Sequence, residues 1–170
     1  MSAIPNARTI SLASLNDSMP AALRPVESLH ELLAEESSPL KWTRISAFSR
    51  FATSVDDLVE WIDDASEDTL EGYRARFRLF LASLARAEKC YAYLPRAGRS
   101  DTAIVCDEEV AQALATALSE NAEADLFIPH RGIALLGHDD FGCNLVYQGV
   151  GDRQWVEELA TEAGLYSLRP

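Results

Sequence analysis

The sequence predicts an α+β protein in which N-terminal helices pack with an antiparallel sheet of about five strands. Three observations support this fold class. Apolar residues follow a helical period as far as residue 88 and then occur in short runs that are typical of strands. Links of only a few residues join these runs, which favours antiparallel pairing. Strands and helices do not alternate regularly, which disfavours a doubly wound nucleotide-binding fold.

The start of the chain shows no sustained period and contains three prolines within its first 25 residues. We therefore expect residues 1–25 to be a flexible N-terminal arm and residues 26–170 to form a single domain. Leucines at helical spacing predict that this domain begins with a helix within residues 26–37, which Pro39 closes.

A helical hairpin is predicted next. Ser54 is a suitable N-cap for a helix over residues 54–65, because acidic residues follow it in the first turn. The apolar stripe of this helix consists of Val55, Leu58, Val59 and Ile62. A second and longer helix is expected over residues 66–88, with its own apolar stripe.

The rest of the chain predicts the order β-β-α-β-β-β-α. The strands are expected at residues 90–94, 102–106, 124–129, 132–137 and 143–149, and the helices at 107–121 and 152–164. The first two strands should form a hairpin, and residues 165–170 are compatible with a final edge strand. Helices grouped in this way are expected to cover one face of the sheet.

The composition of the chain limits its function. The formal net charge of −12 repels nucleic acid and anionic membranes but attracts a basic protein. No run of 18 apolar residues is present that could span a membrane. Three widely spaced cysteines without a C-x-x-C pair favour free thiols in a reducing cytoplasm. We find no cofactor fingerprint and therefore expect no cofactor.

The segment "HDDFGC" (138–143) contains the Asp-Phe-Gly tripeptide of protein kinases. The chain lacks the glycine-rich loop, strand lysine and catalytic loop that a kinase also needs, so we interpret this match as coincidence. Possible metal ligands also lie close together here: His130, His138, Asp139, Asp140 and Cys143. They do not follow a known ligand spacing, so we expect no metal site.

Two other interpretations of this segment stay open. A small hydrolase could use His138 or His130 as a base, with Asp140 on the same side of a hairpin as His138 and with Cys143 or Cys106 as a nucleophile. The simpler interpretation is a turn between two strands, with permissive glycines, turn-forming aspartates and Phe141 folded back on the sheet.

A block of acidic residues is the most informative feature for function. From Asp56 to Glu71 the chain has eight acidic residues and no basic one. These acids could simply pair with Arg74 and Arg78 of the next helix, or they could bind a partner, with Trp61 as the apolar anchor. The candidate partner-binding residues are Asp56, Asp57, Glu60, Trp61, Asp63, Asp64, Glu67, Asp68, His138, Asp139 and Asp140.

In size, acidity and element order the chain resembles small bacterial immunity proteins, which bind and neutralise a toxin. It also resembles the acidic secretion chaperones of effector proteins. Both resemblances imply a cytoplasmic, non-enzymatic protein whose partner is another protein, and neither transfers any site residue. The expected function is therefore that of an immunity-type factor for a basic toxin, with the secretion chaperone and the small hydrolase as alternatives.

Overall fold

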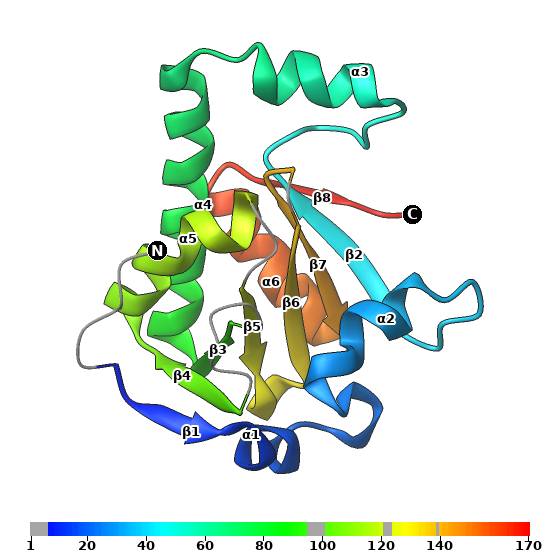
Figure 1. Cartoon of the computed structure of the whole chain (residues 1–170), viewed down its shortest axis with the longest axis vertical. Coiled ribbons are helices and arrows are strands. Elements are labelled where there is room, and N and C mark those ends of the chain that lie inside the picture. The colour runs from blue at the N-terminus through cyan, green and yellow to red at the C-terminus, as the bar shows by residue number, and fades with distance from the viewer. Residues whose placement is uncertain (1–6, 95–100, 121–123, 139) are drawn as a thin grey trace.

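The computed structural model describes residues 7–94, 101–120, 124–138 and 140–170. It contains an eight-stranded sheet in the order β1-β4-β3-β5-β6-β7-β2-β8, in which every pair of neighbours is antiparallel (Figure 1). The strands are β1 (Thr9–Ser11), β2 (Lys41–Ser46), β3 (Cys90–Tyr93), β4 (Thr102–Cys106), β5 (Asp125–Ile128), β6 (Ile133–His138), β7 (Gly142–Tyr147) and β8 (Tyr166–Leu168). The α+β class and the antiparallel pairing are thus as the sequence predicts.

Helices precede, interrupt and follow the strands. The α-helices are α1 (Leu12–Ser18), α2 (Leu29–Ala34), α3 (Val55–Leu58), α4 (Glu67–Ala87), α5 (Glu108–Glu120) and α6 (Val150–Glu162). A π-helix, Val59–Asp63, continues α3, and short 3-10 turns lie at Ala21–Leu23, Val26–Ser28 and Pro129–Arg131. None of the described helices is both long and apolar enough to cross a lipid bilayer.

The expected number and order of strands need correction. The segment 90–162 has the predicted order β-β-α-β-β-β-α, but β1 and β2 precede it and β8 follows it. The strand β2 was not predicted, because polar residues occur on both of its faces and hide the alternation. It lies inside the sheet, between β7 and β8.

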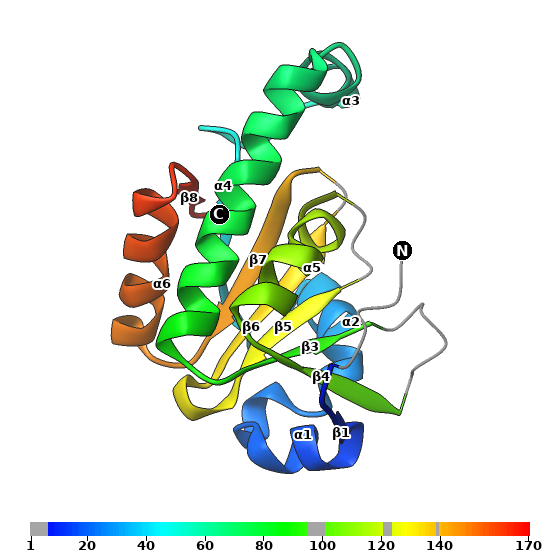
Figure 2. The same ribbon diagram turned by 90° about the vertical axis from the view of Figure 1, so that its left-hand side faces the viewer.

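One face of the sheet carries the larger core. The helices α4, α5 and α6 pack on this face (Figure 2). Phe77 and Phe80 of α4 are fully buried there, as are Ile45 of β2 and Leu135 of β6. Side chains that alternate along each strand supply the apolar surface beneath the three helices.

The N-terminal segment covers the opposite face, so the expectation of helices on one face only is wrong. Leu15, Met19 and Leu23 are at most 1% exposed and pack with Phe127 and Leu136 of the sheet. The segment is also tied to the sheet by β1, which pairs with β4. The described part of residues 1–25 is therefore packed against the domain, whereas the sequence suggested a loosely attached arm.

The helical hairpin projects beyond the sheet. The α3 helix and the π-helix lie at the N-terminal end of α4 (Figures 1 and 2). Ser54 caps α3 as predicted, since its hydroxyl accepts a hydrogen bond from the amide of Asp57. However, none of residues 55–63, all of which the structure describes, is buried, and Val55 is 75% exposed. We call residues 55–68 the acidic limb.

Candidate functional site

The second face of the sheet is polar where the N-terminal segment does not cover it. Arg44 of β2 lies directly opposite Asn144 of β7, and His138 ends the next strand, opposite Gly142. Because side chains alternate across a strand, Arg44, Asn144 and His138 belong to the same face. They form a polar row across β2, β7 and β6 at the edge of an otherwise apolar surface.

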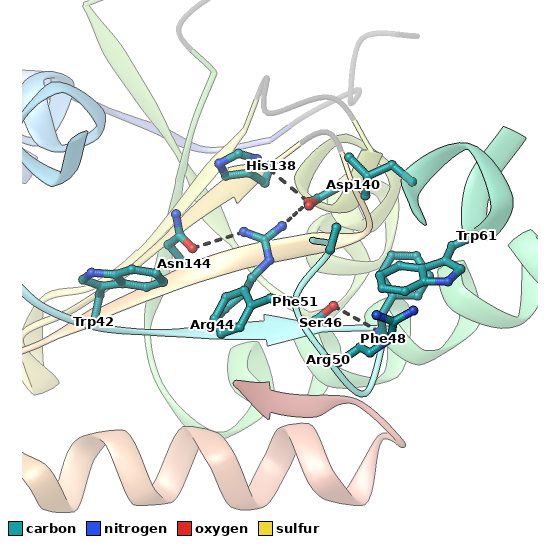
Figure 3. A pocket seen from close by; sticks show the side chains of 12 residues that line it. Trp42, Arg44, Ser46, Phe48, Arg50, Phe51, Trp61, His138, Asp140 and Asn144 are labelled. Atoms are coloured by element: carbon teal, nitrogen blue, oxygen red, sulfur yellow. Dashed lines mark hydrogen bonds and ion pairs between the residues drawn. The ribbon is translucent and has the colours of Figure 1, made fainter. Parts of the chain in front are cut away.

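Arg44 organises this row, as Figure 3 shows. Its Nη1 donates a hydrogen bond to Oδ1 of Asn144 over 3.2 Å, and its Nη2 donates to Oδ1 of Asp140. The Nδ1 atom of His138 lies 3.8 Å from the same carboxylate oxygen. The guanidinium group passes over Gly142, where a Cβ atom would lie 2.5 Å from Nη2 of Arg44. The absence of a Cβ atom at Gly142 therefore allows the guanidinium group of Arg44 to lie close to the β7 backbone.

A cavity of about 230 Å³ lies over the polar row. Its lining residues are Trp42, Arg44, Ser46, Phe48, Arg50, Phe51, Ala52, Leu58, Trp61, His138, Asp140 and Asn144. We call it the Arg44 cavity. It combines aromatic walls with a few convergent polar groups, which is the usual character of a ligand-binding pocket.

One wall of the cavity belongs to the acidic limb itself, because Trp61 lies there in contact with Phe48 and Arg50. The ring centroids of Phe48 and Trp61 are 4.8 Å apart, and the guanidinium carbon of Arg50 lies 4.7 Å from the centroid of the Trp61 ring. Arg50 also pairs with Asp57 over 3.1 Å. Hydrogen bonds from the hydroxyl and the amide of Thr53 lower the pKa of the Asp57 carboxyl group, and Arg50 lowers it further.

The structure brings some of the predicted site residues together. Trp61, His138 and Asp140 line the Arg44 cavity, and Asp57 reaches its wall through Arg50. The other described candidates are exposed along the acidic limb: Asp56, Glu60, Asp63, Asp64, Glu67 and Asp68. Asp139 lies outside the described residues. The expected anchor, Trp61, is half-buried between Phe48 and Arg50, so the more exposed apolar side chains of the limb are Val55 and Val59.

Helix pairing accounts for only part of the acidic block. Nη1 of Arg74 lies 2.5 Å from Glu67, and Arg78 pairs with Glu71. This salt bridge lowers the pKa of the Glu71 carboxyl group. Within the described part of the chain, no ion pair engages the remaining acids, which are Asp56, Glu60, Asp63, Asp64 and Asp68.

The segment 138–143 joins β6 to β7, as the turn interpretation predicts. Phe141 folds back and is 3% exposed, and its ring contacts that of Tyr73 at a centroid distance of 5.4 Å. Among the described residues of this turn, Phe141 has a positive φ angle of 52°, whereas the sequence suggested that the glycines would supply such angles. Gly142 instead begins β7 and makes room for Arg44.

The geometry does not bring Cys143 together with His138. Cys143 is fully buried on the helix-covered face, whereas His138 is on the other face of the sheet. Burial raises the pKa values of Cys90 and Cys143 to about 12, and it also raises that of Cys106. All three are free, buried thiols and stay protonated at neutral pH.

A metal site is not formed by the described residues, since no three His, Cys, Asp or Glu side chains among them gather closely enough. Of the possible metal ligands that the sequence offered, His130 lies beside Glu88, with its Nδ1 atom 3.7 Å from that carboxylate, and His138 lies beside Asp140.

Sequence reasoning missed the residues that form most of the cavity. Arg44 and Trp42 belong to the unpredicted strand β2. Asn144 was visible as a polar residue inside an apolar run, at a position where a strand would bury it. This polar residue at a buried strand position was the one feature of the sequence that could have indicated a polar site on this face of the sheet.

No protein-family model, curated protein or solved structure compared with the chain matches it significantly. The chain's own residues must therefore support any assignment of function.

Proposed function

We propose that this chain is a non-enzymatic binding protein that captures a basic protein through the acidic limb. The observation that carries the proposal is the combination of unpaired acids and exposed apolar side chains on one projecting element. Val55 and Val59 are 75% and 38% exposed, and Asp56, Glu60 and Asp63 accompany them in the sequence.

The two kinds of residue have different roles in binding. Unpaired carboxylates create a local negative field, which raises the association rate of a cationic surface. Ionic contacts at an exposed rim add little affinity, so burial of apolar side chains must supply the rest. The limb has both properties, and none of its residues is fully buried, although Ile62 packs partly against the larger core.

The partner that fits best is a basic toxin, and the proposed class is an immunity-type protein of the cytoplasm. A toxin that acts on nucleic acid carries a cationic surface, because it must neutralise phosphate groups. An acidic limb can occupy such a surface without any catalytic step. The net charge of −12 supports the same electrostatic preference over the whole chain.

Photo-cross-linking tests the existence of this partner. A photoreactive amino acid at Val59, in cells that naturally produce the protein, should cross-link a protein of basic isoelectric point. The matched control carries the same group at Leu79 of α4, which is 52% exposed and lies outside the limb. Equal products from both positions, or an acidic product from Val59, would contradict the proposal.

Charge reversal then tests the mechanism with the purified partner. Asp63→Lys with Asp64→Lys should slow association about tenfold or more at low salt and flatten its salt dependence. Stability should stay within about 0.5 kcal/mol, because both residues are exposed. Stopped-flow measurements over a salt series give the rates.

Glu35→Lys with Glu36→Lys is the matched control, since these exposed acids lie between α2 and β2. The control pair should reduce the rate much less than the limb pair. If both pairs act equally, the effect comes from net charge and the limb is not the binding surface.

A further inference from the structure

We propose that Asp57 and Trp61 of the acidic limb bind an arginine side chain of the basic partner, and that Arg50 of this chain occupies their site until the partner displaces it. This inference rests on the proposed function, since it names the residue type by which the limb recognises its partner. The evidence is a guanidinium site that the limb already forms for Arg50 and that other contacts hold in place.

Arg50 shows which chemical group the site accepts. Its guanidinium carbon lies 4.7 Å from the centroid of the Trp61 ring, and its Nη2 donates a hydrogen bond to Oδ1 of Asp57 over 3.1 Å. Figure 3 shows Arg50 and Trp61 together, on the side of the Arg44 cavity away from Trp42. A planar cation that stacks on an indole ring and donates to a carboxylate is typical of arginine recognition.

The two halves of the site are held in position without Arg50. Oδ2 of Asp57 accepts hydrogen bonds from the amide and the hydroxyl of Thr53, each over 2.7 Å, and Oδ1 is the atom that meets the guanidinium group. The Trp61 ring contacts Phe48 at a centroid distance of 4.8 Å, and Phe48 contacts Tyr73 at 5.3 Å. A site whose groups are fixed beforehand loses less entropy when its ligand binds.

Arg50 itself is weakly held. It lies in the loop between β2 and α3, and its side chain is 57% exposed. It lines both the Arg44 cavity and a second cavity of about 330 Å³, so it has free space in which to move aside without unpacking the core. Because exposed ion pairs and exposed cation–π contacts each stabilise a structure only slightly, a competing arginine can replace it.

The charges around the site favour a cationic ligand. The positive charge of Arg44 is already matched by Asp140, and the exchange of Arg50 for another arginine adds no net positive charge to this wall. The unpaired acids of the limb attract the incoming side chain. Lysine fits less well, because its compact and strongly hydrated ammonium group cannot stack as a plane on the indole ring.

The first test uses three small probes and no partner. N-acetylarginine amide, N-acetyllysine amide and the neutral N-acetylcitrulline amide are titrated into the protein, and NMR follows the indole N–H signals of its three tryptophans. Arg50→Ala empties the site, so this variant should bind the arginine probe about three- to tenfold more tightly than the wild type, with the shift at Trp61. The lysine and citrulline probes should bind it more weakly.

Arg86→Ala is the matched control, because Arg86 is also an exposed arginine, paired with Glu108, and it lies outside the limb. This variant should bind the arginine probe as the wild type does. The signal of Trp155, which stacks with Arg131 at 4.1 Å, should stay in place throughout and shows that each variant is folded.

Three outcomes of the titration would overturn the proposal. The first is equal affinity of Arg50→Ala and the wild type for the arginine probe, since Arg50 would then not occupy the site. The second is a citrulline probe that binds as tightly as the arginine probe, which would mean stacking without recognition of charge. The third is a shift confined to Trp42, which would place the probe away from the limb.

The second test adds Asp57→Asn to Arg50→Ala. Asparagine keeps an oxygen that accepts from Thr53 but loses the negative charge, so affinity for the arginine probe should fall about fivefold or more. Glu36→Gln in the same background removes an exposed acid outside the limb and should leave the affinity unchanged. If Asp57→Asn has no effect, the carboxylate does not bind the arginine and the proposal is wrong.

The probe titration and the cross-linking test fail independently. If cross-linking at Val59 identifies a basic partner but the arginine probe does not bind, this inference fails and the proposed function stands. If the probe binds and no basic partner is found, the proposed function fails while the guanidinium site stands. With a purified partner, Arg50→Ala should raise its affinity about three- to tenfold, and a loss of affinity would show that Arg50 itself contacts the partner.

Discussion

The Arg44 side chain is about nine-tenths buried, and its charge is stabilised by Asp140 and Asn144. A buried cation without such partners would cost several kcal/mol, so its neighbours are tightly constrained. Gly142 is one of these neighbours, since a Cβ atom at this position would force the guanidinium group of Arg44 to shift.

Gly142→Ala should therefore destabilise the protein by about 1–3 kcal/mol, because the new methyl group displaces Arg44 from Asp140. Gly72→Ala is the matched control. Gly72 lies within α4, and its Cβ position has no atom within 4 Å, so this change should stabilise the protein by up to about 1 kcal/mol. Urea unfolding measures both. A neutral Gly142→Ala would show that Arg44 moves aside without loss.

A second polar contact holds the N-terminal segment to the sheet. Nε2 of His30 in α2 lies 2.9 Å from Oδ1 of Asp125, a carboxylate that is 2% exposed. The amide of Gly137 also donates to this oxygen over 3.0 Å. The hydrogen bond to Asp125 raises the pKa of His30 above its ordinary value of 6.5, and the negative charge of Asp125 adds to the effect, although burial opposes it.

This raised pKa predicts the sign of a pH effect. The folded state binds the proton of His30 more tightly than the unfolded state. The resulting stability is fully present below about pH 6.5 and is lost as the pH rises through the folded pKa. The free energy of unfolding of the wild type relative to His30→Gln should therefore be largest at acidic pH. A difference that grows from pH 6 to pH 8 would show that the sign is wrong.

Single residues also show what the sequence could reveal about the site. The positions of His138 and Asp140 on one side of a hairpin follow from strand alternation, and so does the return of Phe141 to the core. The role of Arg44 could not be predicted, because its partners lie about a hundred residues away along the chain. Local patterns carry no information about such a distant pairing.

At the level of elements, apolar runs between turn residues predicted β3 to β7 well. The strand β2 was not predicted, because Lys41, Thr43, Arg44 and Ser46 are polar. Prediction from apolar runs assumes that the residues of a buried strand are apolar. For the acidic limb, the apolar residues were recognised but their surroundings were not. Its stripe predicted correctly which side of the helix is apolar, but amphipathicity does not specify what covers that side.

Hydrogen exchange should separate these elements. Residues 102–106, 133–136 and 144–147 should exchange most slowly, since they lie in paired strands beneath both cores. The helical amides of residues 55–63 should exchange much faster, because no described residue of that segment is buried. Strong protection of the limb in the isolated protein would mean that another surface covers it.

For the whole molecule, the sheet is the middle layer of three. The helices α4, α5 and α6 form one outer layer, and the N-terminal segment forms the other. The sequence suggested only the first of these. Short helices interrupted by prolines lack a sustained period, although Leu15, Met19, Leu23 and Val26 are buried as deeply as the main core.

Leu15→Ala should therefore destabilise the protein by about 2–5 kcal/mol, the usual range for a fully buried leucine. Leu79→Ala, at a position 52% exposed on α4, should change stability by no more than about 0.5 kcal/mol. Thermal and urea unfolding give both values. Equal and small effects would indicate that the N-terminal segment behaves as a loose arm after all.

The position of β2 between β7 and β8 has a consequence for biosynthesis. Arg44 leaves the ribosome a hundred residues before Asn144, and β2 pairs with no earlier strand among the described residues. A nascent chain that ends before β7 can form the β3–β4 hairpin and α4, but both edges of β2 are still unpaired, because its partners β7 and β8 come later in the chain. Such edges attract other chains, so this interval is when the growing polypeptide most needs a chaperone. The Arg44 cavity is completed only when β7 joins β2, because Asn144 of β7 forms part of its lining.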